Sequence, residues 1–382
     1  MDVVIGIAGK PNAGKSTLFS AMTGTMVAIG DYQFTTTETN KGVAYIVSKC
    51  PHTEINKECN PRRGRCFSGT RYIPIEILDI PGLIEGSGNG KGMGNKFMDS
   101  IRGASAMINL ISPVSDGKEM LSAQEIEQGA KEVENEIIYW FSSRLGSDWD
   151  KFCRKVSHMQ GPIEEKLLHK VGFFGIGPDE IKKILNSGNF PENLSAWNEE
   201  NMENFSRIAM TVIRPIRRIV NKGDLLEKTE EFRAKNMSVI SADYELSIQK
   251  AYSAGIISDM ESLAPTDKAT QKQVDALEKI RSDFHTGKID RIQKILTDMI
   301  KVQMENIVVY PVYDESKWCD KEGKVLPDAF IMKNTDTALD LAFAVHTEIG
   351  QGFIRAINGR NRMILGKNYE MKDSDVIRII SK

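Results

Sequence analysis

The sequence predicts an α/β chain whose mostly parallel sheet is interrupted by a helical insertion and followed by a small β-rich module. Three observations indicate this order. Short β-branched runs alternate with helix-sized segments at both ends of a long middle stretch, strand patterns vanish within that stretch, and short strands return near the C-terminus. We therefore expect two parts of one α/β domain at 1–115 and 207–305, the second ending in a helical linker, with the insertion at 116–206 and the module at 306–382.

The composition is that of an ordinary folded protein with two or three domains. Of its 382 residues, 41% are hydrophobic and 27% are charged, which excludes long disorder, a collagen repeat and a disulfide scaffold. The net charge of -2 means that any nucleic-acid surface must be a local patch. No apolar stretch approaches the roughly eighteen residues of a membrane span, no export signal is seen, and five cysteines fit a reducing compartment. We expect a cytoplasmic protein without membrane contact, and a monomer by default.

The first part of the α/β domain is expected to contain three strands. The apolar run Val3–Ala8 stops at a glycine-rich turn, after which residues 16–22 have the pattern of a helix. Two further apolar runs, Tyr72–Leu78 and Ala106–Ile111, stand a helix-sized distance apart. Alternation of strands and helices at this spacing is typical of a parallel sheet.

The rest of the chain is assigned by the same periodicities. In the insertion, apolar residues such as Ile126, Val133 and Ile137 recur at helical spacing. Strand character returns at 216–220 and 237–240, and Val274–Met304 is expected to be helical with Ile289 in phase. In the module, strands at 307–310 and 376–380 should flank a helix near 338–348.

Residues 9–16 match the pattern G-x-x-x-x-G-K-[ST] between a strand and a helix, which is the setting that a phosphate-binding loop requires. Glycines let the backbone N–H groups turn toward phosphates, Lys15 reaches the β- and γ-phosphate oxygens, and Ser16 offers a hydroxyl to Mg²⁺. A chance turn is the alternative. The residues expected to bind nucleotide here are Gly9, Pro11, Asn12, Ala13, Gly14, Lys15, Ser16 and Thr17.

Three further short motifs follow predicted strands. Asp79 opens the sequence DIPG, where we expect the carboxylate to hold Mg²⁺ and Gly82 to sense the γ-phosphate. The motif Asn221-Lys222-Gly223-Asp224 provides a carboxylate that can accept from two donors present in guanine and absent from adenine. A simple turn and an exposed helix cap are the respective alternatives. Ser241 and Ala242 are expected to close the base pocket through backbone N–H groups.

The order of these motifs resembles the TRAFAC class of GTPases. Within it, Tyr32–Thr37, the sequence IEG at 84–86 and Gly90–Phe97 resemble the Obg family. The helical insertion, with Leu326–Phe330 and Asp340–His346 similar to a ubiquitin-like β-grasp (TGS) module, resembles the YchF-type branch of that family as found in archaea.

This resemblance implies a P-loop NTPase fold that binds GTP and GDP, hydrolyses GTP slowly with Mg²⁺, and associates with the ribosome or RNA. It implies that Thr36 is the threonine that contacts Mg²⁺ and the γ-phosphate, with Thr35 or Thr37 as alternatives. Bacterial and eukaryotic YchF-type members carry an altered base-reading motif and are associated with ATP, whereas the motif here is intact, which favours GTP. A YchF-type ATPase and a nucleotide-sensing RNA-binding module with incidental turnover are the alternatives.

The residue that positions the attacking water is not evident. Leu83 stands where Ras-like proteins have a glutamine, and leucine has no polar group for this task. The side-chain carbonyl of Asn12 is a candidate ligand for K⁺, as in GTPases with a similar loop, and the cation would stabilise the transition state. A turn residue is the alternative for Asn12. Lys15, Thr36, Gly82 and Asn12 are therefore the expected catalytic residues.

Two other groups of residues have no place in the nucleotide motifs. Cys50, His52, Cys59 and Cys66 have side chains that could complete a tetrahedral Zn²⁺ site, although their spacing fits no standard finger; half-buried free thiols are the alternative. Basic residues are candidates for RNA phosphates, with solvated loops as the alternative. They are the run Arg62-Arg63-Gly64-Arg65 with Arg71, and Arg355, Arg360, Arg362 and Lys367 in the module.

Overall fold

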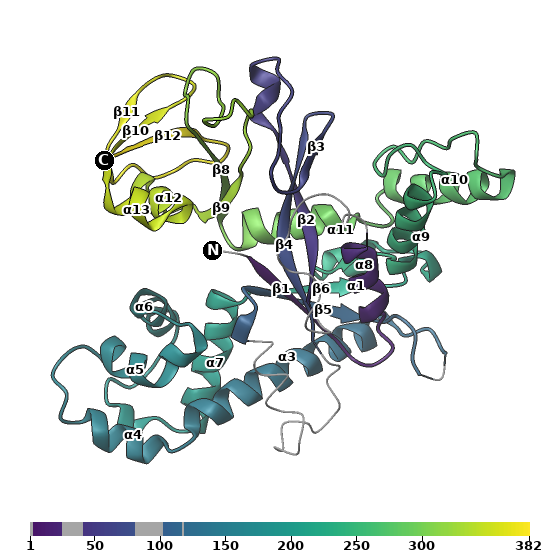
Figure 1. The fold of residues 1–382 in the computed structure, drawn as a ribbon. Helices are drawn as coiled ribbons and strands as arrows, with labels where there is room; N and C mark the ends of the chain where they lie inside the picture. The colour runs from purple at the N-terminus through teal and green to yellow at the C-terminus, as the bar shows by residue number, and fades with distance from the viewer. Residues whose placement is uncertain (1–2, 25–40, 81–101, 117) are drawn as a thin grey trace.

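The computed structural model describes residues 3–24, 41–80, 102–116 and 118–382. They form a central sheet, a group of helices below it and a smaller sheet beside it (Figure 1). No helix in these ranges is both long enough and apolar enough to span a bilayer.

The central sheet has the strand order β2-β4-β1-β5-β6-β7, with β3 also paired to β4. Strands β1, β4, β5, β6 and β7 pair in parallel, and only β2 and β3 run antiparallel to β4. The α/β fold with a mostly parallel sheet is thus confirmed. The strands span Val4–Ala8 (β1), Lys41–Lys49 (β2), Arg65–Phe67 (β3), Thr70–Asp79 (β4), Ala106–Ile111 (β5), Ile216–Val220 (β6) and Ser238–Val239 (β7).

The segment between β5 and β6 is helical and has an apolar core of its own. Ser122 and Glu125 form a capping box that begins the long helix α3, since each side chain bonds the other's backbone N–H. The last helix, α7, continues beyond residue 206 because Ala209 and Met210 are buried on its inner face. The helices are α3 (Ala123–Gly146), α4 (Trp149–Val156), α5 (Ile163–Val171), α6 (Pro178–Ser187) and α7 (Glu199–Ile213).

The remaining helices of the α/β domain are α1 (Lys15–Thr23), α8 (Glu230–Ala234), α9 (Ala242–Ser253), α10 (Gln271–His285) and α11 (Ile292–Asp298). The predicted helical stretch Val274–Met304 is largely helical but is broken at residues 286–291. Helix α10 ends at His285, and Gly287 adopts a φ of 72°, a left-handed conformation that glycine adopts readily and that ends helices. The chain turns there before α11, so Ile289 is buried in a loop.

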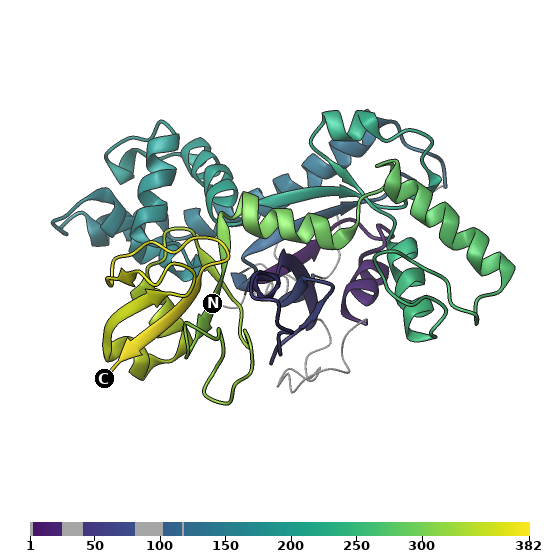
Figure 2. The same ribbon diagram turned by 90° about the horizontal axis from the view of Figure 1, so that it is seen from above.

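The C-terminal module contains a five-stranded sheet of order β11-β10-β12-β8-β9. One face packs on helix α12, and the other face joins the core of the α/β domain, where Val308, Tyr310 and Val376 cluster with Ile46 and Cys50. Figure 2 shows α11 lying between the two sheets. The elements are β8 (Asn306–Val312), β9 (Phe330–Lys333), α12 (Ala338–Val345), α13 (Thr347–Gln351), β10 (Phe353–Asn358), β11 (Ile364–Leu365) and β12 (Val376–Ser381).

Candidate active site

The loop between β1 and α1 depends on glycine at two positions. Gly9 has a φ of 153°, and a Cβ there would lie 2.3 Å from the carbonyl oxygen of Leu110. Gly14 has a φ of 92°, and a Cβ there would lie 2.3 Å from Nδ2 of Asn221. Neither distance is compatible with a side chain, so these glycines let the loop lie against β5 and against the base-reading motif.

Lys15 lies over this loop at the start of α1. Its Nζ donates to the carbonyl oxygens of Gly9, at 3.0 Å, and Lys10, at 2.9 Å. Burial lowers the pKa of Lys15 and raises that of Asp79, and each group opposes the shift of the other through its charge. The register of β1 on β4 pairs Ile7 with Asp79, which brings the carboxylate to the same edge of the sheet as the loop.

Asn221 connects three segments that are far apart in the sequence. It is 2% exposed, its Nδ2 donates to the carbonyl oxygen of Ala13 at 2.8 Å, and its Oδ1 accepts from the N–H of Ala242 at 2.9 Å. One side chain therefore ties the phosphate-binding loop to β6 and to the start of α9. The N–H of Ala242, predicted to close the base pocket, donates to Asn221 in this structure, and Oγ of Ser241 caps α9 by accepting from the N–H of Tyr244; closure of the base pocket by these residues stays a prediction.

One carboxylate oxygen of Asp224, Oδ1, is buried and unpaired: it has no hydrogen-bond partner in the described residues. A buried oxygen without a partner is costly, and this one is free to accept a hydrogen bond from a bound base. The neighbouring Lys222 has a φ of 55° and donates from Nζ to Oγ of Ser112 at 3.2 Å, which links the base-reading motif to the end of β5.

The phosphate-binding loop also contacts Asp116, which follows β5, and helix α3. Nδ2 of Asn12 donates to Oδ1 of Asp116 at 3.1 Å, and Nζ of Lys10 pairs with Oε2 of Glu132 at 2.6 Å. A cavity of about 480 Å³ lies between this loop, the end of β5 and α3. Sequence reasoning did not identify either acidic residue, because Asp116 contacts a residue 104 positions away and no local pattern marks such a contact.

Several predicted site residues lie outside the described residues. They are Thr36 and its neighbours Thr35 and Thr37, the residues Gly82 and Leu83, and the family-like segments at 32–37, 84–86 and 90–97. Of the predicted magnesium ligands, Ser16 at the start of α1 and Asp79 at the end of β4 are described.

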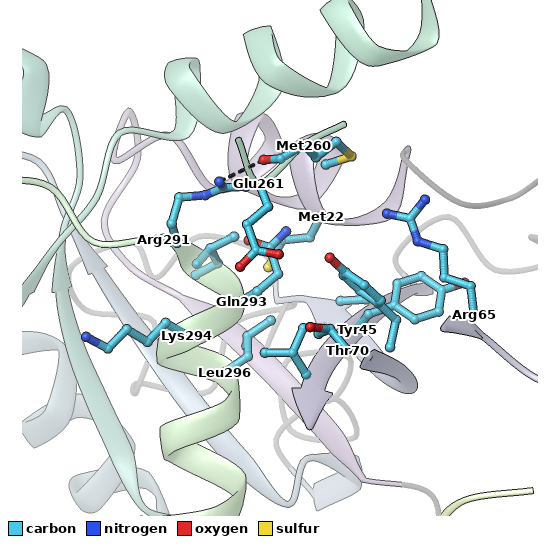
Figure 3. Close-up of a pocket in the computed structure, with 14 residues that line it drawn as sticks. Met22, Tyr45, Arg65, Thr70, Met260, Glu261, Arg291, Gln293, Lys294 and Leu296 are labelled. Carbon is cyan, nitrogen blue, oxygen red and sulfur yellow. Dashed lines mark hydrogen bonds between the residues drawn. The ribbon is translucent and has the colours of Figure 1, made fainter. Parts of the chain in front are cut away.

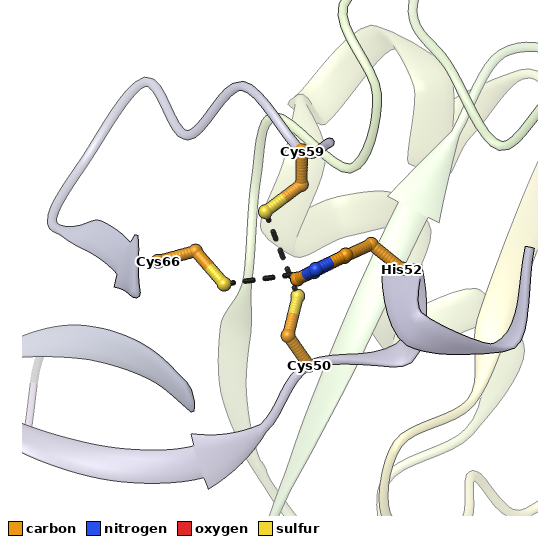
Figure 4. A group of neighbouring side chains, drawn as sticks. All are labelled: Cys50, His52, Cys59 and Cys66. Carbon is orange, nitrogen blue, oxygen red and sulfur yellow. Dashed lines mark hydrogen bonds between the residues drawn. The ribbon is translucent and has the colours of Figure 1, made fainter. Parts of the chain in front are cut away.

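The cysteine and histidine side chains predicted to form a metal site lie together. The ligand atoms of Cys50, His52, Cys59 and Cys66 are all within 4.8 Å of one another (Figure 4). The cluster lies in the loop between β2 and β4. Hydrogen bonds from the Cys50 and Cys66 thiols are the main cause of a lowered pKa at Cys59, and the nearby charges of His52 and Arg71 act in the same direction.

Much of the basic surface predicted to meet RNA is occupied by contacts within the chain. Arg62 pairs with Asp320 and Asp328, and Arg71 is 1% exposed and donates to the Pro327 carbonyl oxygen. In the module, Arg360 forms two hydrogen bonds with Glu54, while Arg362 contacts Ser316 and Glu315. Of these guanidinium groups only that of Arg71 is buried; Arg62, Arg360 and Arg362 are exposed but already paired with acidic side chains, so their role in RNA binding stays a prediction.

A separate cavity of about 270 Å³ lies where α11 meets β2 and β4 (Figure 3). Arg65, Tyr45 and Thr70 line it from the strands, and Gln293 and Arg291 line it from the start of α11. Arg291 donates to the carbonyl oxygen of Met260 at 2.9 Å, which closes one side. Lys15, Asp79 and Asp224 do not line this cavity, so it is distinct from the site at the phosphate-binding loop.

Three family models match the chain. One described as 50S ribosome-binding GTPase matches residues 4–142, and one described as Obg-like GTPase YGR210-like, G4 motif-containing domain matches residues 219–314. A TGS domain model matches residues 322–381.

Known proteins resemble the chain over its full length. An uncharacterized GTP-binding protein of Methanocaldococcus jannaschii is 37% identical over 398 aligned positions that cover 99% of each chain. The ribosome-binding ATPase YchF of Buchnera aphidicola is 24% identical over 403 positions that cover 98% of each. The crystal structure of a GTP binding protein from Pyrococcus horikoshii superposes with a TM-score of 0.79 and 27% identity, covering 100% of both chains.

Proposed function

The chain belongs to the Obg-like family of P-loop GTPases with a C-terminal TGS domain, and we propose that it is a guanine-selective switch that acts on the ribosome. The family models and the relative that is 37% identical confirm the resemblance noted in the sequence, and GTP binding and hydrolysis are the activities of this family. Selectivity for guanine over adenine, the roles of individual residues and the ribosomal partner are proposals, and each rests on a separate observation.

The unpaired Oδ1 of Asp224 carries the proposal of guanine selectivity. A guanine base has two adjacent donors, N1–H and the exocyclic amine, that a carboxylate can accept together. Adenine presents an unprotonated ring nitrogen at that position, so the carboxylate would stay buried without a partner. Asn221 supports the proposal of guanine selectivity, because its bond to Ala13 holds the segment before Asp224 against the phosphate-binding loop.

The residues at the edge of the sheet fit a magnesium nucleotide. Ser16 supplies a hydroxyl and Asp79 a carboxylate, which are the hard oxygen donors that Mg²⁺ prefers, and Thr36 would add a third. When bound, the ion neutralises charge that develops on the phosphates. Lys15 now donates to the carbonyl oxygens of the loop, so phosphate oxygens would replace these weak acceptors with charged ones.

Asn12 remains the proposed ligand for K⁺. Its φ of 62° accounts for an asparagine in this turn, and its Nδ2 is bonded to Asp116. This bond orients the amide and leaves the side-chain oxygen as the group that would contact a cation. Asp116 adds negative charge beside that position, which favours a cation there.

The ribosomal partner is proposed from a relative and from the exposed surface of the module. The related YchF protein is named as ribosome-binding. Arg355 on β10 and Lys367, two residues after β11, are exposed and form no ion pair with a described residue. Ile354, Met363 and Ile364 expose 53%, 59% and 64% of their surface on the β10–β11 hairpin. Basic and apolar residues together suit a surface of RNA and protein, and this partner would place the chain in the cytoplasm.

Sedimentation with ribosomes tests this proposal. We expect the protein to pellet with ribosomes most strongly with a non-hydrolysable GTP analogue, and less with GDP or without nucleotide. The double variant R355E/K367E should lose binding, whereas K151E, an equally exposed charge reversal on α4, should retain it. Equal pelleting of both variants would exclude the hairpin as the contact, and a lack of pelleting in every state would exclude the ribosome.

A further inference from the structure

Two distances within the cysteine and histidine cluster match those between the ligands of a tetrahedral zinc site. In a zinc site the Zn–S bond is about 2.3 Å and the Zn–N bond about 2.0–2.1 Å, so two sulfur ligands stand about 3.8 Å apart and a sulfur and a nitrogen about 3.5 Å apart. The distance from Cys50 Sγ to Cys59 Sγ is 3.8 Å, and Cys66 Sγ lies 3.5 Å from His52 Nδ1. Figure 4 shows the four side chains pointing toward one centre.

The chemistry of the four ligands also selects the ion. Three thiolates and one imidazole form a soft and borderline set that suits Zn²⁺ and does not suit Mg²⁺ or Ca²⁺. All three cysteines are free thiols and form no disulfide with a described residue. Binding would displace the thiol protons to solvent. With four protein ligands the site has no open position for a substrate, which is typical of a structural ion.

The loop that carries the ligands contacts the C-terminal module. We call residues 50–69, between β2 and β4, the knuckle. The N–H of Asn60 donates to Val325 O at 2.8 Å, and the N–H of Arg62 donates to Pro327 O at 2.9 Å. The Arg62 side chain reaches Asp320 at 2.5 Å and Asp328 at 2.6 Å.

The knuckle makes a second contact with the C-terminal module. Glu54, between His52 and Cys59 in sequence, accepts two hydrogen bonds from Arg360 at 2.7 and 2.8 Å. Arg71, the second residue of β4, donates from its guanidinium group to Cys59 Sγ and to the carbonyl oxygen of Pro327. Along the sequence, the residues that contact the C-terminal module thus alternate with the four residues of the cysteine and histidine cluster.

We propose that Cys50, His52, Cys59 and Cys66 bind one Zn²⁺, and that this ion fixes the knuckle as the docking surface for the C-terminal module. Apart from a short 3-10 turn and the three residues of β3, the knuckle has no regular structure of its own. An ion bound by these four side chains would hold Glu54, Asn60 and Arg62 in the arrangement that contacts the module. The knuckle would then lose less conformational entropy when the module docks.

Metal analysis and hydrogen exchange on the full-length protein test both parts of this proposal. Protein purified without chelator should contain about one zinc per chain, and Co²⁺ in its place should give the absorption of a tetrahedral thiolate site. Removal of the metal should speed amide exchange at Asn60 and Arg62 by at least about tenfold, because these N–H groups bond across the interface. Exchange in α3 should not change.

Variants provide the matched controls. C59S should lose the zinc and show the faster exchange, whereas C153S, which removes a buried free thiol in the helical segment, should keep both properties of the wild type. The measurement on wild-type protein with and without chelator needs no variant, so misfolding of C59S leaves the test intact. Absence of metal even after zinc is added would overturn the site, and zinc whose removal leaves exchange at Asn60 and Arg62 unchanged would overturn its role in docking.

Discussion

Replacing Asn221 with alanine should weaken GDP binding by removing the link between the phosphate-binding loop and the start of α9. The Asn221 side chain bonds the carbonyl oxygen of Ala13 and the N–H of Ala242, at 2.8 and 2.9 Å, and is 2% exposed. Without it, both backbone groups lose their partner. In the free protein the two loops can move and let water reach these groups, but in the complex the nucleotide covers them, so the penalty falls mainly on the bound state.

The size of the effect follows from the number of groups left unpaired. A buried polar group without a partner costs about 1–3 kcal/mol, so two such groups cost about 2–6 kcal/mol. The lower limit corresponds to a dissociation constant about 30-fold higher. Because the loss concerns the loops and not the base, GDP and GTP should be weakened by similar factors.

Isothermal titration calorimetry with Mg²⁺ and GDP measures this effect. N358A is a matched control, since Asn358 is 6% exposed and accepts from the backbone N–H of Arg360 within the C-terminal module. We expect N358A to lower the free energy of unfolding while leaving GDP affinity within about threefold, which is below 1 kcal/mol. If N221A binds GDP as tightly as the wild type, the linkage of the loops by Asn221 has no functional role.

Three further predictions concern single contacts. D224N should weaken GTP and improve xanthosine triphosphate, whose C2 carbonyl can accept from the new amide; competition binding measures the change, and unaltered preference would exclude Asp224 as the base reader. GTP hydrolysis should be slow and faster in K⁺ than in Na⁺ at equal ionic strength, and N12A should abolish the difference in steady-state rates; fast turnover in Na⁺ alone would refute a K⁺ role. Arg360 lowers the pKa of Glu54, so the pair stabilises the fold above pH 4.5, the ordinary pKa of a glutamate, and this contribution is lost as the pH falls through the lowered value. E54Q should therefore reduce the acid dependence of the unfolding free energy, and an unchanged pH profile would contradict the pairing.

Much of the site was predictable because its motifs are local. The phosphate-binding loop needs a strand, glycines at fixed positions and a helix start, all of which are visible within residues 3–22. The base-reading motif follows a short β-branched strand in the same way. The roles of Thr36, Gly82 and Leu83 remain predictions, since these residues lie outside the described part of the chain.

Contacts between distant segments were not predictable in the same way. Strand β2 was missed, although residues 43–47 form a β-branched and aromatic run with alternating burial and its pairing with β4 extends over nine residues. The basic residues of the module were interpreted as a surface for RNA, yet Arg360 pairs with Glu54, which is 306 positions away. The apolar periodicity also predicted helical structure across Gly287, whereas α10 ends at His285 and Gly287 is left-handed.

Competition between GTP and ATP for the wild-type protein tests the central claim most directly. The measurement uses Mg²⁺, a fluorescent GDP displaced by each unlabelled nucleotide, and non-hydrolysable analogues to exclude turnover. Because Asp224 can accept from two donors that only guanine offers, GTP should bind at least about 100-fold more tightly than ATP, which is about 2.7 kcal/mol. Equal affinities for the two nucleotides would contradict guanine selectivity and would favour an ATPase.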